Sequence, residues 1–353
     1  PSMRRAPLFW TIVAAATVAA FVHAWSLRWT CDDAFISFRY ARNFVDGHGL
    51  VFNLDPQEAP VEGYSNFAWT MWLALGLVFG FVGDALESWA AFWGALLHAA
   101  TVLWIGYCSW RSSRGTAVVP IAAPALAANY YAASLAPAGL ETALFVFLVA
   151  VMAGLSIERR CPRHVWLLGF LGVLAAMTRP DGALPVMAAG LVVLVDAARS
   201  KTLRPVVAYS APLLACMVPY LLWRHAYYGY WVPNTFYAKS GGDPYPGQGL
   251  VYCVEFAKTY AIVLVPALLA WLLLPLRRGD RFAAVDPWSG RRPGAVLLLF
   301  ALPYLGFVIW VGGDFMFGRF LLPILPLWLL ALDLTLGRRP WLAVVGAVVA
   351  LGG

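Results

Sequence analysis

The sequence predicts an all-α, polytopic transmembrane protein. Of its 353 residues, 61% are hydrophobic and only 12% are charged, about half the ~25% charged fraction that soluble globular domains carry. Long apolar segments recur along the whole chain, and short groups of basic residues separate them. Because a helix of about 20 apolar residues spans a bilayer, the length allows roughly ten spans with their loops.

The net charge of +7 has the pattern of membrane topology rather than of nucleic-acid binding. The basic residues stand in pairs and trios between apolar segments, and no lysine-rich run occurs. Cytoplasmic loops of membrane proteins carry such an excess of Lys and Arg. We therefore expect the lipid bilayer, and no nucleic acid, as a partner.

The apolar segments predict about 11 spans within a single transmembrane domain over residues 1–353. These spans cover residues 7–27, 88–110, 115–133, 142–157, 165–178, 183–198, 206–223, 261–276, 295–311, 320–336 and 341–353.

One further apolar segment, from Phe67 to Val82, is short and decides the topology. If it crossed the membrane, the later basic loops would lie on the side opposite Arg4 and Arg5. If it lies at the interface, all of them fall on the cytoplasmic side. The positive-inside rule favours the second arrangement. Two long loops, at about residues 28–87 and 224–260, then lie outside the cell.

The first outer loop contains an amphipathic helix, which we predict from Asp33 to Asp46 and expect to lie along the membrane surface. Its apolar face carries Phe35, Phe38, Ala41 and Phe44. The glycines of Gly47-His48-Gly49 end it.

Asp32 and Asp33 follow the first span directly. A carboxylate at the membrane surface can accept a proton from a sugar hydroxyl or hold a divalent cation, so both are candidate catalytic residues. The alternative is that one of them caps the following helix, which leaves the other free.

Other polar residues of the outer side are candidates for substrate binding. Carboxylate, phenol and amide groups bind sugar hydroxyls, and outward cations neutralise a phosphate at the membrane surface. The alternative for Glu62, Tyr64, Asn66 and Glu141 is that they only mark the start of a helix. The alternative for the cations is that they only snorkel to water. The candidates are Glu62, Tyr64, Asn66, Glu141, Arg179, Asp181, Lys239, Asp314 and Arg319. In the segment from Gly312 to Arg319, the glycines let the backbone approach a ligand closely.

Several motifs resemble those of the GT-C membrane glycosyltransferases, and more narrowly the terminal β-(1→2)-arabinofuranosyltransferase family of mycobacterial cell-wall assembly. The motifs occur in the family's order: Asp32-Asp33-Ala34, Arg39, Arg42-Asn43, Gly47-x-Gly49, Val51-Phe52-Asn53, Glu62, Gly139-Leu140-Glu141, Arg179-Pro180-Asp181, Tyr228-Gly229, Val232-Pro233-x-Thr235, Ala238-Lys239, Gln248-Gly249 and Gly312 to Arg319. The chain departs from the family at Phe317, where a His is usual, and at Asp181, where a Glu is usual.

The resemblance implies a pentosyl- or hexosyltransferase of cell-wall biogenesis in the bacterial plasma membrane. Its donor is a polyprenyl-phosphate sugar, its acceptor is a glycan or glycolipid, and its active site faces the extracytoplasmic side. No cofactor is firmly implied, although a divalent cation at Asp32 or Asp33 fits. The resemblance adds Arg39, Arg42 and Asn234 to the substrate-binding residues. The family's soluble C-terminal domain is missing from these residues.

Two other functions are open to this sequence. A GT-C enzyme that decorates lipid A or protein shares the Asp-bearing first loop. A transporter or flippase of lipid-linked saccharides is the second alternative, but transporters place polar groups or broken helices near the midplane. Here the polar residues gather in the outer loops, which favours the transferase.

Overall fold

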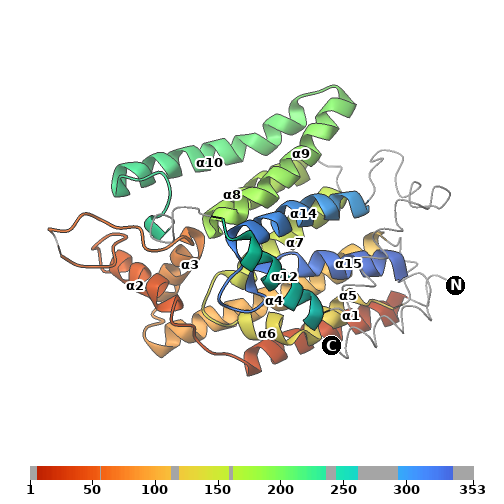
Figure 1. Ribbon diagram of the computed structural model, residues 1–353, viewed down its shortest axis with the longest axis horizontal. Coiled ribbons are helices and arrows are strands. Elements are labelled where there is room, and N and C mark those ends of the chain that lie inside the picture. The colour runs from red at the N-terminus through yellow and green to blue at the C-terminus, as the bar shows by residue number, and fades with distance from the viewer. Residues whose placement is uncertain are drawn as a thin grey trace.

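The computed structural model describes residues 6–55, 57–112, 119–158, 162–235, 244–260 and 293–336. Over these ranges the chain forms helices and no strand. The helices run mostly along the long axis of the molecule, and α2 and α3 lie at the end opposite the N-terminus (Figure 1).

The helices have the following bounds. They are α1 (Ala6–Ser26), α2 (Ala34–Val45), α3 (Phe67–Val78), α4 (Asp84–Ser112), α5 (Ala122–Ala128), α6 (Tyr130–Leu135), α7 (Thr142–Glu158), α8 (Pro162–Thr178), η1 (Pro180–Gly182), α9 (Ala183–Ser200), α10 (Arg204–Tyr228), α12 (Pro246–Thr259), α14 (Pro293–Val311), η3 (Arg319–Leu321) and α15 (Leu325–Leu336).

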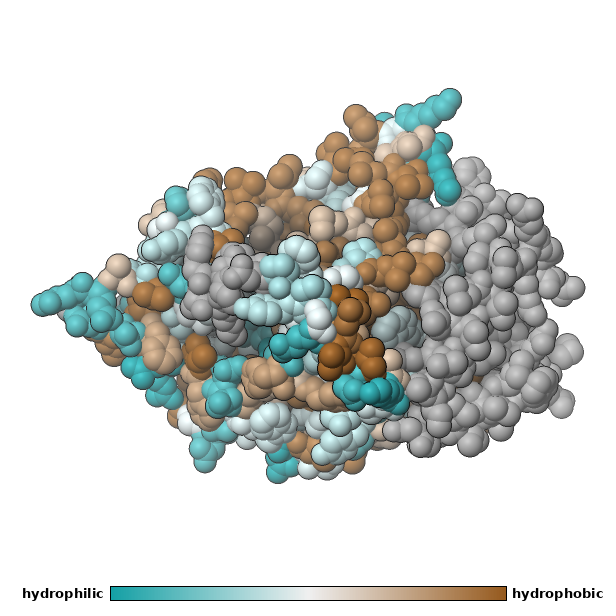
Figure 2. All heavy atoms as spheres, in the orientation of Figure 1, coloured by the Kyte–Doolittle hydropathy of each residue, from teal (hydrophilic) through white to brown (hydrophobic). Residues whose placement is uncertain are grey.

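Five helical segments in the described ranges are long and apolar enough to cross a bilayer: Ala6–Ser26, Asp84–Ser112, Pro180–Ser200, Arg204–Tyr228 and Pro293–Val311. Hydrophobic residues cover the surface around α8 to α10, whereas hydrophilic residues gather at the end formed by the first outer loop (Figure 2). The chain is therefore a membrane protein, and these five helices are fewer than the predicted spans.

Some predicted spans differ from the observed helices. The predicted span at 115–133 is not one continuous helix in the described residues, because the helix is interrupted at Asn129, whose side chain accepts a hydrogen bond from the Ala132 N–H at 2.8 Å and so caps α6. The span at 320–336 begins as a short 3₁₀ turn, and its α-helix starts only at Leu325. The spans at 261–276 and 341–353 lie outside the described residues.

The short helix α3 agrees with an interfacial position. Its 12 residues extend about 18 Å, well short of the ~30 Å hydrocarbon core. It ends before Gly80, whose φ of 87° suits a glycine because a left-handed backbone is strained for other residues.

The amphipathic helix of the first outer loop forms as α2, but its faces differ from the prediction. Phe38 and Ala41 are buried as expected, whereas Phe35 and Phe44 are exposed. Ser37 and Asn43 are buried instead, and their side chains hydrogen bond to Asn66 and to the Val51 carbonyl.

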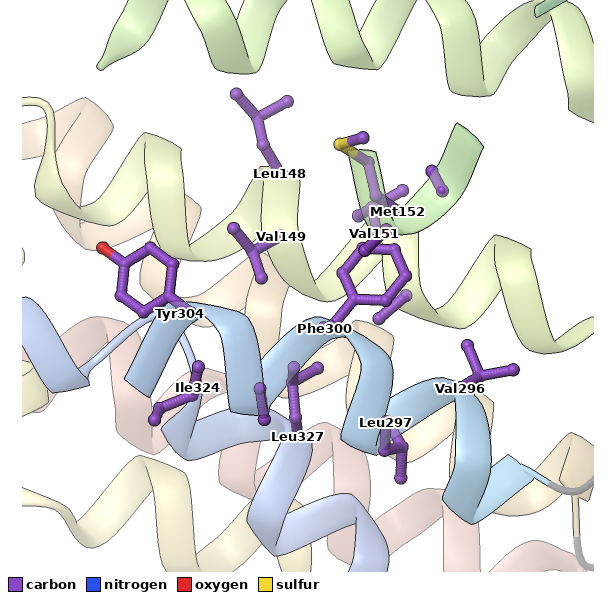
Figure 3. Packing of buried hydrophobic residues seen from close by; sticks show 14 of the residues in the cluster. Leu148, Val149, Val151, Met152, Val296, Leu297, Phe300, Tyr304, Ile324 and Leu327 are labelled. Atoms are coloured by element: carbon purple, nitrogen blue, oxygen red, sulfur yellow. The ribbon is translucent and has the colours of Figure 1, made fainter. Parts of the chain in front are cut away.

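The largest apolar cluster joins α7, α14 and α15, and Figure 3 shows its packing. Lipid is as apolar as these side chains, so the cluster stabilises the bundle mainly through close packing. Tyr304 lies at one end of the labelled residues, and its hydroxyl points away from them (Figure 3). That hydroxyl belongs to the polar site described next.

Candidate functional site

The carboxylate of Glu141, directly before α7, is the centre of a buried polar network. One oxygen, Oε1, accepts hydrogen bonds from Nη1 of Arg179 at 3.3 Å and Nη2 of Arg319 at 3.4 Å. The other, Oε2, accepts one from Nδ2 of Asn66 at 2.9 Å. Burial alone would raise the pKa of Glu141, but Arg319, Arg179 and Asn66 together hold it below its ordinary value. Glu141 is therefore ionised at neutral pH.

Arg179 is held on several sides. Its Nε donates to Oδ1 of Asp181 at 2.9 Å, and its guanidinium carbon lies 5.3 Å and 4.8 Å from the ring centres of Phe145 and Phe320. The hydroxyl of Tyr304 donates to the other Asp181 oxygen at 2.5 Å. Only 8% of Arg179 is exposed, so this arginine is fixed by the protein.

Arg319 enters the network from the loop after α14. Its Nη1 lies 3.6 Å from Oδ2 of Asp314 and 3.7 Å from the sulfur of Met316. Its Nε is buried and has no hydrogen-bond partner within the described ranges. A buried N–H without a partner costs free energy, so it is a candidate for contact with a substrate.

Asn66 connects the network to the first outer loop. Its Oδ1 accepts hydrogen bonds from the hydroxyls of Ser37 and Thr70, each at 3.1 Å. Because its Nδ2 donates to Glu141, this one amide joins α2, α3 and the start of α7. Segments far apart in the chain thus converge on one carboxylate.

Asp32 and Asp33 lie in the segment before α2, which is hydrogen-bonded to the loop that carries Glu141. The Cys31 N–H donates to the Ala138 carbonyl at 3.0 Å, which fixes the chain before α2 against the loop that carries Glu141. Asp33 precedes Ser37 by four residues, so the two share a face of α2. Asp32 is exposed and Asp33 half-exposed.

Neither aspartate caps α2 in the way the alternative required. Asp33 holds the cap position, but its side chain makes no capping hydrogen bond. Oδ1 of Asp32 accepts from the Asp33 N–H at 2.9 Å and from the Cys31 thiol at 3.2 Å. The carboxylate of Asp33 is thus not engaged in capping.

A second cluster lies where the first outer loop meets the end of α10. The Nε of Arg224 donates to both Glu62 oxygens, at 2.9 Å and 2.7 Å, and its Nη1 donates to the Trp231 carbonyl at 3.1 Å. Oδ1 of Asn234 accepts from the Glu62 N–H at 3.0 Å. Burial raises the pKa of Glu62 although Arg224 opposes it.

Tyr64 is buried beside this second cluster, and its hydroxyl lies 3.4 Å from that of Tyr228. Glu62 and Tyr64 are only 2% and 3% exposed. Their observed contacts join the loop to α10. The structure therefore brings Glu62, Tyr64 and Asn234 together in this second cluster. None of the hydrogen bonds described for this cluster connects it to the Glu141 network.

The remaining predicted residues stand outside both clusters. Arg39 is exposed, donates from Nε to the Phe52 carbonyl at 2.7 Å and stacks on the Phe52 ring. Arg42 is exposed in the last turn of α2. Lys239 lies outside the described residues.

The sequence did not single out Ser37, Arg224 or Tyr304. Arg224 directly follows the predicted span at 206–223, so it was a visible cation at a span end. Tyr304 stands in an apolar span, where its phenol was the only feature that could have indicated a functional residue. Ser37 gave none, because a small polar residue on a surface helix is common.

The glycines of the segment from Gly312 to Arg319 do not face open space. A Cβ on Gly313 would lie 2.5 Å from the Tyr252 ring, and one on Gly312 would lie 2.9 Å from Cβ of Tyr245. Residues of α12 and the turn before it thus occupy the place that we expected a ligand to approach.

Within the described ranges, no group of three or more His, Cys, Asp or Glu side chains is arranged to hold a metal ion. The predicted cation at Asp32 or Asp33 would take two carboxylates from the protein. Mg²⁺ commonly completes such a set with waters and substrate phosphates.

Two curated proteins are similar to this chain over most of its length. The terminal β-(1→2)-arabinofuranosyltransferase of Mycobacterium tuberculosis is 30% identical over 343 residues, which cover 89% of this chain and 53% of that protein. The protein of the same name from Corynebacterium glutamicum is 28% identical over 361 residues, which cover 93% of this chain and 51% of that protein.

The chain spans about half the length of the curated relatives it matches. No family model and no solved structure matches it. The resemblance indicated by the sequence motifs is confirmed: this chain is related to the terminal β-(1→2)-arabinofuranosyltransferases.

Proposed function

We propose that this chain is the transmembrane part of a GT-C glycosyltransferase with about 11 spans, which moves arabinofuranose from a polyprenyl-phosphate donor to an extracytoplasmic glycan or glycolipid. The observation that carries the proposal is the convergence of Asn66, Arg179 and Arg319 on Glu141, whose loop is hydrogen-bonded to the segment that carries Asp32 and Asp33. The names of the two relatives support the sugar and a role in cell-wall biogenesis.

In the proposed reaction, an acceptor hydroxyl attacks the anomeric carbon of the donor sugar. The bond from that carbon to the phosphate oxygen breaks, a new glycosidic bond forms, and polyprenyl phosphate leaves with the bonding electrons. Asp33 takes the hydroxyl proton as general base. We favour Asp33 over Asp32 because it shares a face of α2 with Ser37, which belongs to the network.

Negative charge builds on the phosphate as it leaves, and Arg319 is the cation placed to stabilise it. Its Nε–H remains available, whereas Nη1 and Nη2 are oriented by Asp314 and Glu141. Arg179 acts indirectly, because Asp181, Tyr304 and Glu141 already hold it. If a divalent cation takes part, Asp32 and Asp33 would be the residues to hold it, and its charge would supply the same kind of stabilisation.

The active site faces the extracytoplasmic side of the bacterial plasma membrane in this proposal. Nucleotide sugars stay in the cytoplasm, whereas a lipid-phosphate sugar that has crossed the bilayer is available outside. The excess of basic residues in the predicted cytoplasmic loops supports this orientation.

The test is the turnover of Asp33→Asn. With a polyprenyl-phosphate arabinofuranose donor and an arabinose glycoside acceptor, we expect transfer to fall by roughly 10²–10⁴, since the general base is lost. Asp32→Asn tests the neighbouring carboxylate. Asp46→Asn, an exposed aspartate at the other end of α2, is the matched control and should retain wild-type turnover. Near-wild-type transfer by both Asp32→Asn and Asp33→Asn would refute the proposed base.

A further inference from the structure

Helix α12 lies within the second predicted outer loop and has one clearly buried face. Gly249, Phe256 and Tyr260 are buried, and Tyr252 and Cys253 are half-buried. This spacing of three and four residues is that of one helix face. The face lies against α14 and the loop that follows it, while Leu250, Val251 and Val254 are exposed. In Figure 2, hydrophobic spheres lie over α12 with hydrophilic ones beside its C-terminal end.

In the loop at residues 312–318, three glycines pack against this face of α12 and against the turn before the helix. Gly312, Gly313 and Gly318 all have positive φ, between 73° and 88°. A Cβ added to them would lie 2.9 Å from Tyr245, 2.5 Å from Tyr252 and 3.2 Å from Phe256, in that order. Each glycine is thus required both by its backbone conformation and by an aromatic residue packed against it.

The hydroxyl of Tyr252 holds the loop on both sides of Arg319. It donates to the Met316 carbonyl at 3.2 Å and accepts from the Phe320 N–H at 3.2 Å. Met316 also contacts the Arg319 guanidinium through its sulfur. The phenol therefore fixes the short stretch of backbone from which Arg319 projects.

Gly249 sets how closely α12 approaches α14. A Cβ at Gly249 would lie 2.1 Å from the Ile309 carbonyl oxygen, a distance that backbone atoms cannot accommodate without a shift. The Tyr245 N–H donates to the Trp310 carbonyl at 2.9 Å and fixes the start of α12 at the same place. The packing of α12 on α14 thus depends on backbone contacts as well as on side chains.

We propose that α12 is a clamp that positions Arg319 and Asp314, with Gly249 and Tyr252 as positioning residues. The clamp itself follows from the contacts above, and its effect on donor binding rests on the proposed function. Loosening α12 should free the loop and misplace the arginine while leaving the rest of the bundle intact.

The test compares Gly249→Ala with Gly247→Ala. Both glycines lie in α12, so alanine raises helix propensity similarly, but a Cβ at Gly247 would meet nothing within 4 Å. In the purified chain, amide hydrogen exchange of residues 312–320 should become roughly 5–30-fold faster in Gly249→Ala and stay unchanged in Gly247→Ala. Exchange at wild-type rates in a folded Gly249→Ala protein would overturn the clamp.

Tyr252→Phe keeps the inference testable if Gly249→Ala does not fold. It removes both hydroxyl contacts and should also speed exchange of the loop, whereas Tyr209→Phe, which loses a hydroxyl contact to the Val186 carbonyl, should not. In transfer assays, both clamp variants should raise the donor KM more than they lower kcat. If wild-type protein transfers no sugar, the proposed function fails, but the exchange rates still decide whether the clamp exists.

Discussion

Arg179 and Arg319 both contact Glu141, but their guanidinium groups differ in what they can still bind. Arg179 is paired with Asp181 and lies against the rings of Phe145 and Phe320. Arg319 keeps a buried Nε–H with no partner in the part of the chain that the structure describes. A simple snorkelling arginine would direct its donors to water, whereas this one faces inward.

The substitution Arg319→Lys separates phosphate binding from snorkelling. An ammonium group reaches water as well as a guanidinium does, but it cannot reproduce the planar set of donors. We expect donor binding to weaken by about 1.5–3 kcal/mol, the size of a charge-assisted hydrogen bond. The measurement is the donor Kd.

Arg28→Lys is the control, since Arg28 is an exposed arginine on the predicted outer side that contacts the Trp25 ring and carbonyl. Its donor affinity should match that of wild type. An Arg319→Lys protein with unchanged donor affinity would favour the snorkelling alternative.

At the scale of elements, Glu141 joins segments that lie far apart in the sequence. Through Asn66, Arg179 and Arg319 it connects the start of α7 with the starts of α3, η1 and η3. Its pKa is lowered from the ordinary value of 4.5. The ionised form therefore stabilises the fold, and this stability is present above pH 4.5 and is lost as the pH falls through the lowered pKa.

Glu141→Gln should reduce stability by about 3–5 kcal/mol at neutral pH, since two buried arginines lose a partner. The difference in Tm between wild type and Glu141→Gln should be largest above about pH 5 and should shrink in more acidic buffer, where wild-type Glu141 is also neutral. Trp fluorescence during heating measures the Tm of each protein at each pH. Glu255→Gln, in an exposed pair with Lys258, should change Tm little; a Glu141→Gln difference that does not depend on pH would contradict this role.

Helix α12 shows why one element was missed in the sequence. Its buried positions at Gly249, Tyr252, Cys253 and Phe256 have helical spacing, but the surrounding Gly, Pro and Tyr residues indicated a loop. Glycine disfavours an isolated helix, and here it is retained because α14 approaches closely. Tertiary contact thus overrides local propensity.

Over the whole molecule, the sequence predicted a membrane environment better than it predicted the contacts within the site. Low charge and long apolar segments were sufficient to predict a helical membrane protein. That Glu141 and Arg319 lie on the outer side follows from the distribution of basic loops and stays a prediction. Their pairing crosses 178 residues of sequence, so it depends on how distant helices pack, and no local pattern records it.

Release of polyprenyl phosphate measures the proposed reaction most directly. The purified chain would be incubated with polyprenyl-phosphate arabinofuranose, other polyprenyl-phosphate sugars or nucleotide sugars, each with an arabinose glycoside, and the products identified by mass spectrometry. We expect free polyprenyl phosphate and an extended glycoside from the arabinofuranose donor, and neither extended product nor lipid phosphate from nucleotide sugars. Folded protein that releases no polyprenyl phosphate from any lipid-linked donor, or that transfers sugar from a nucleotide donor instead, would contradict the proposed function.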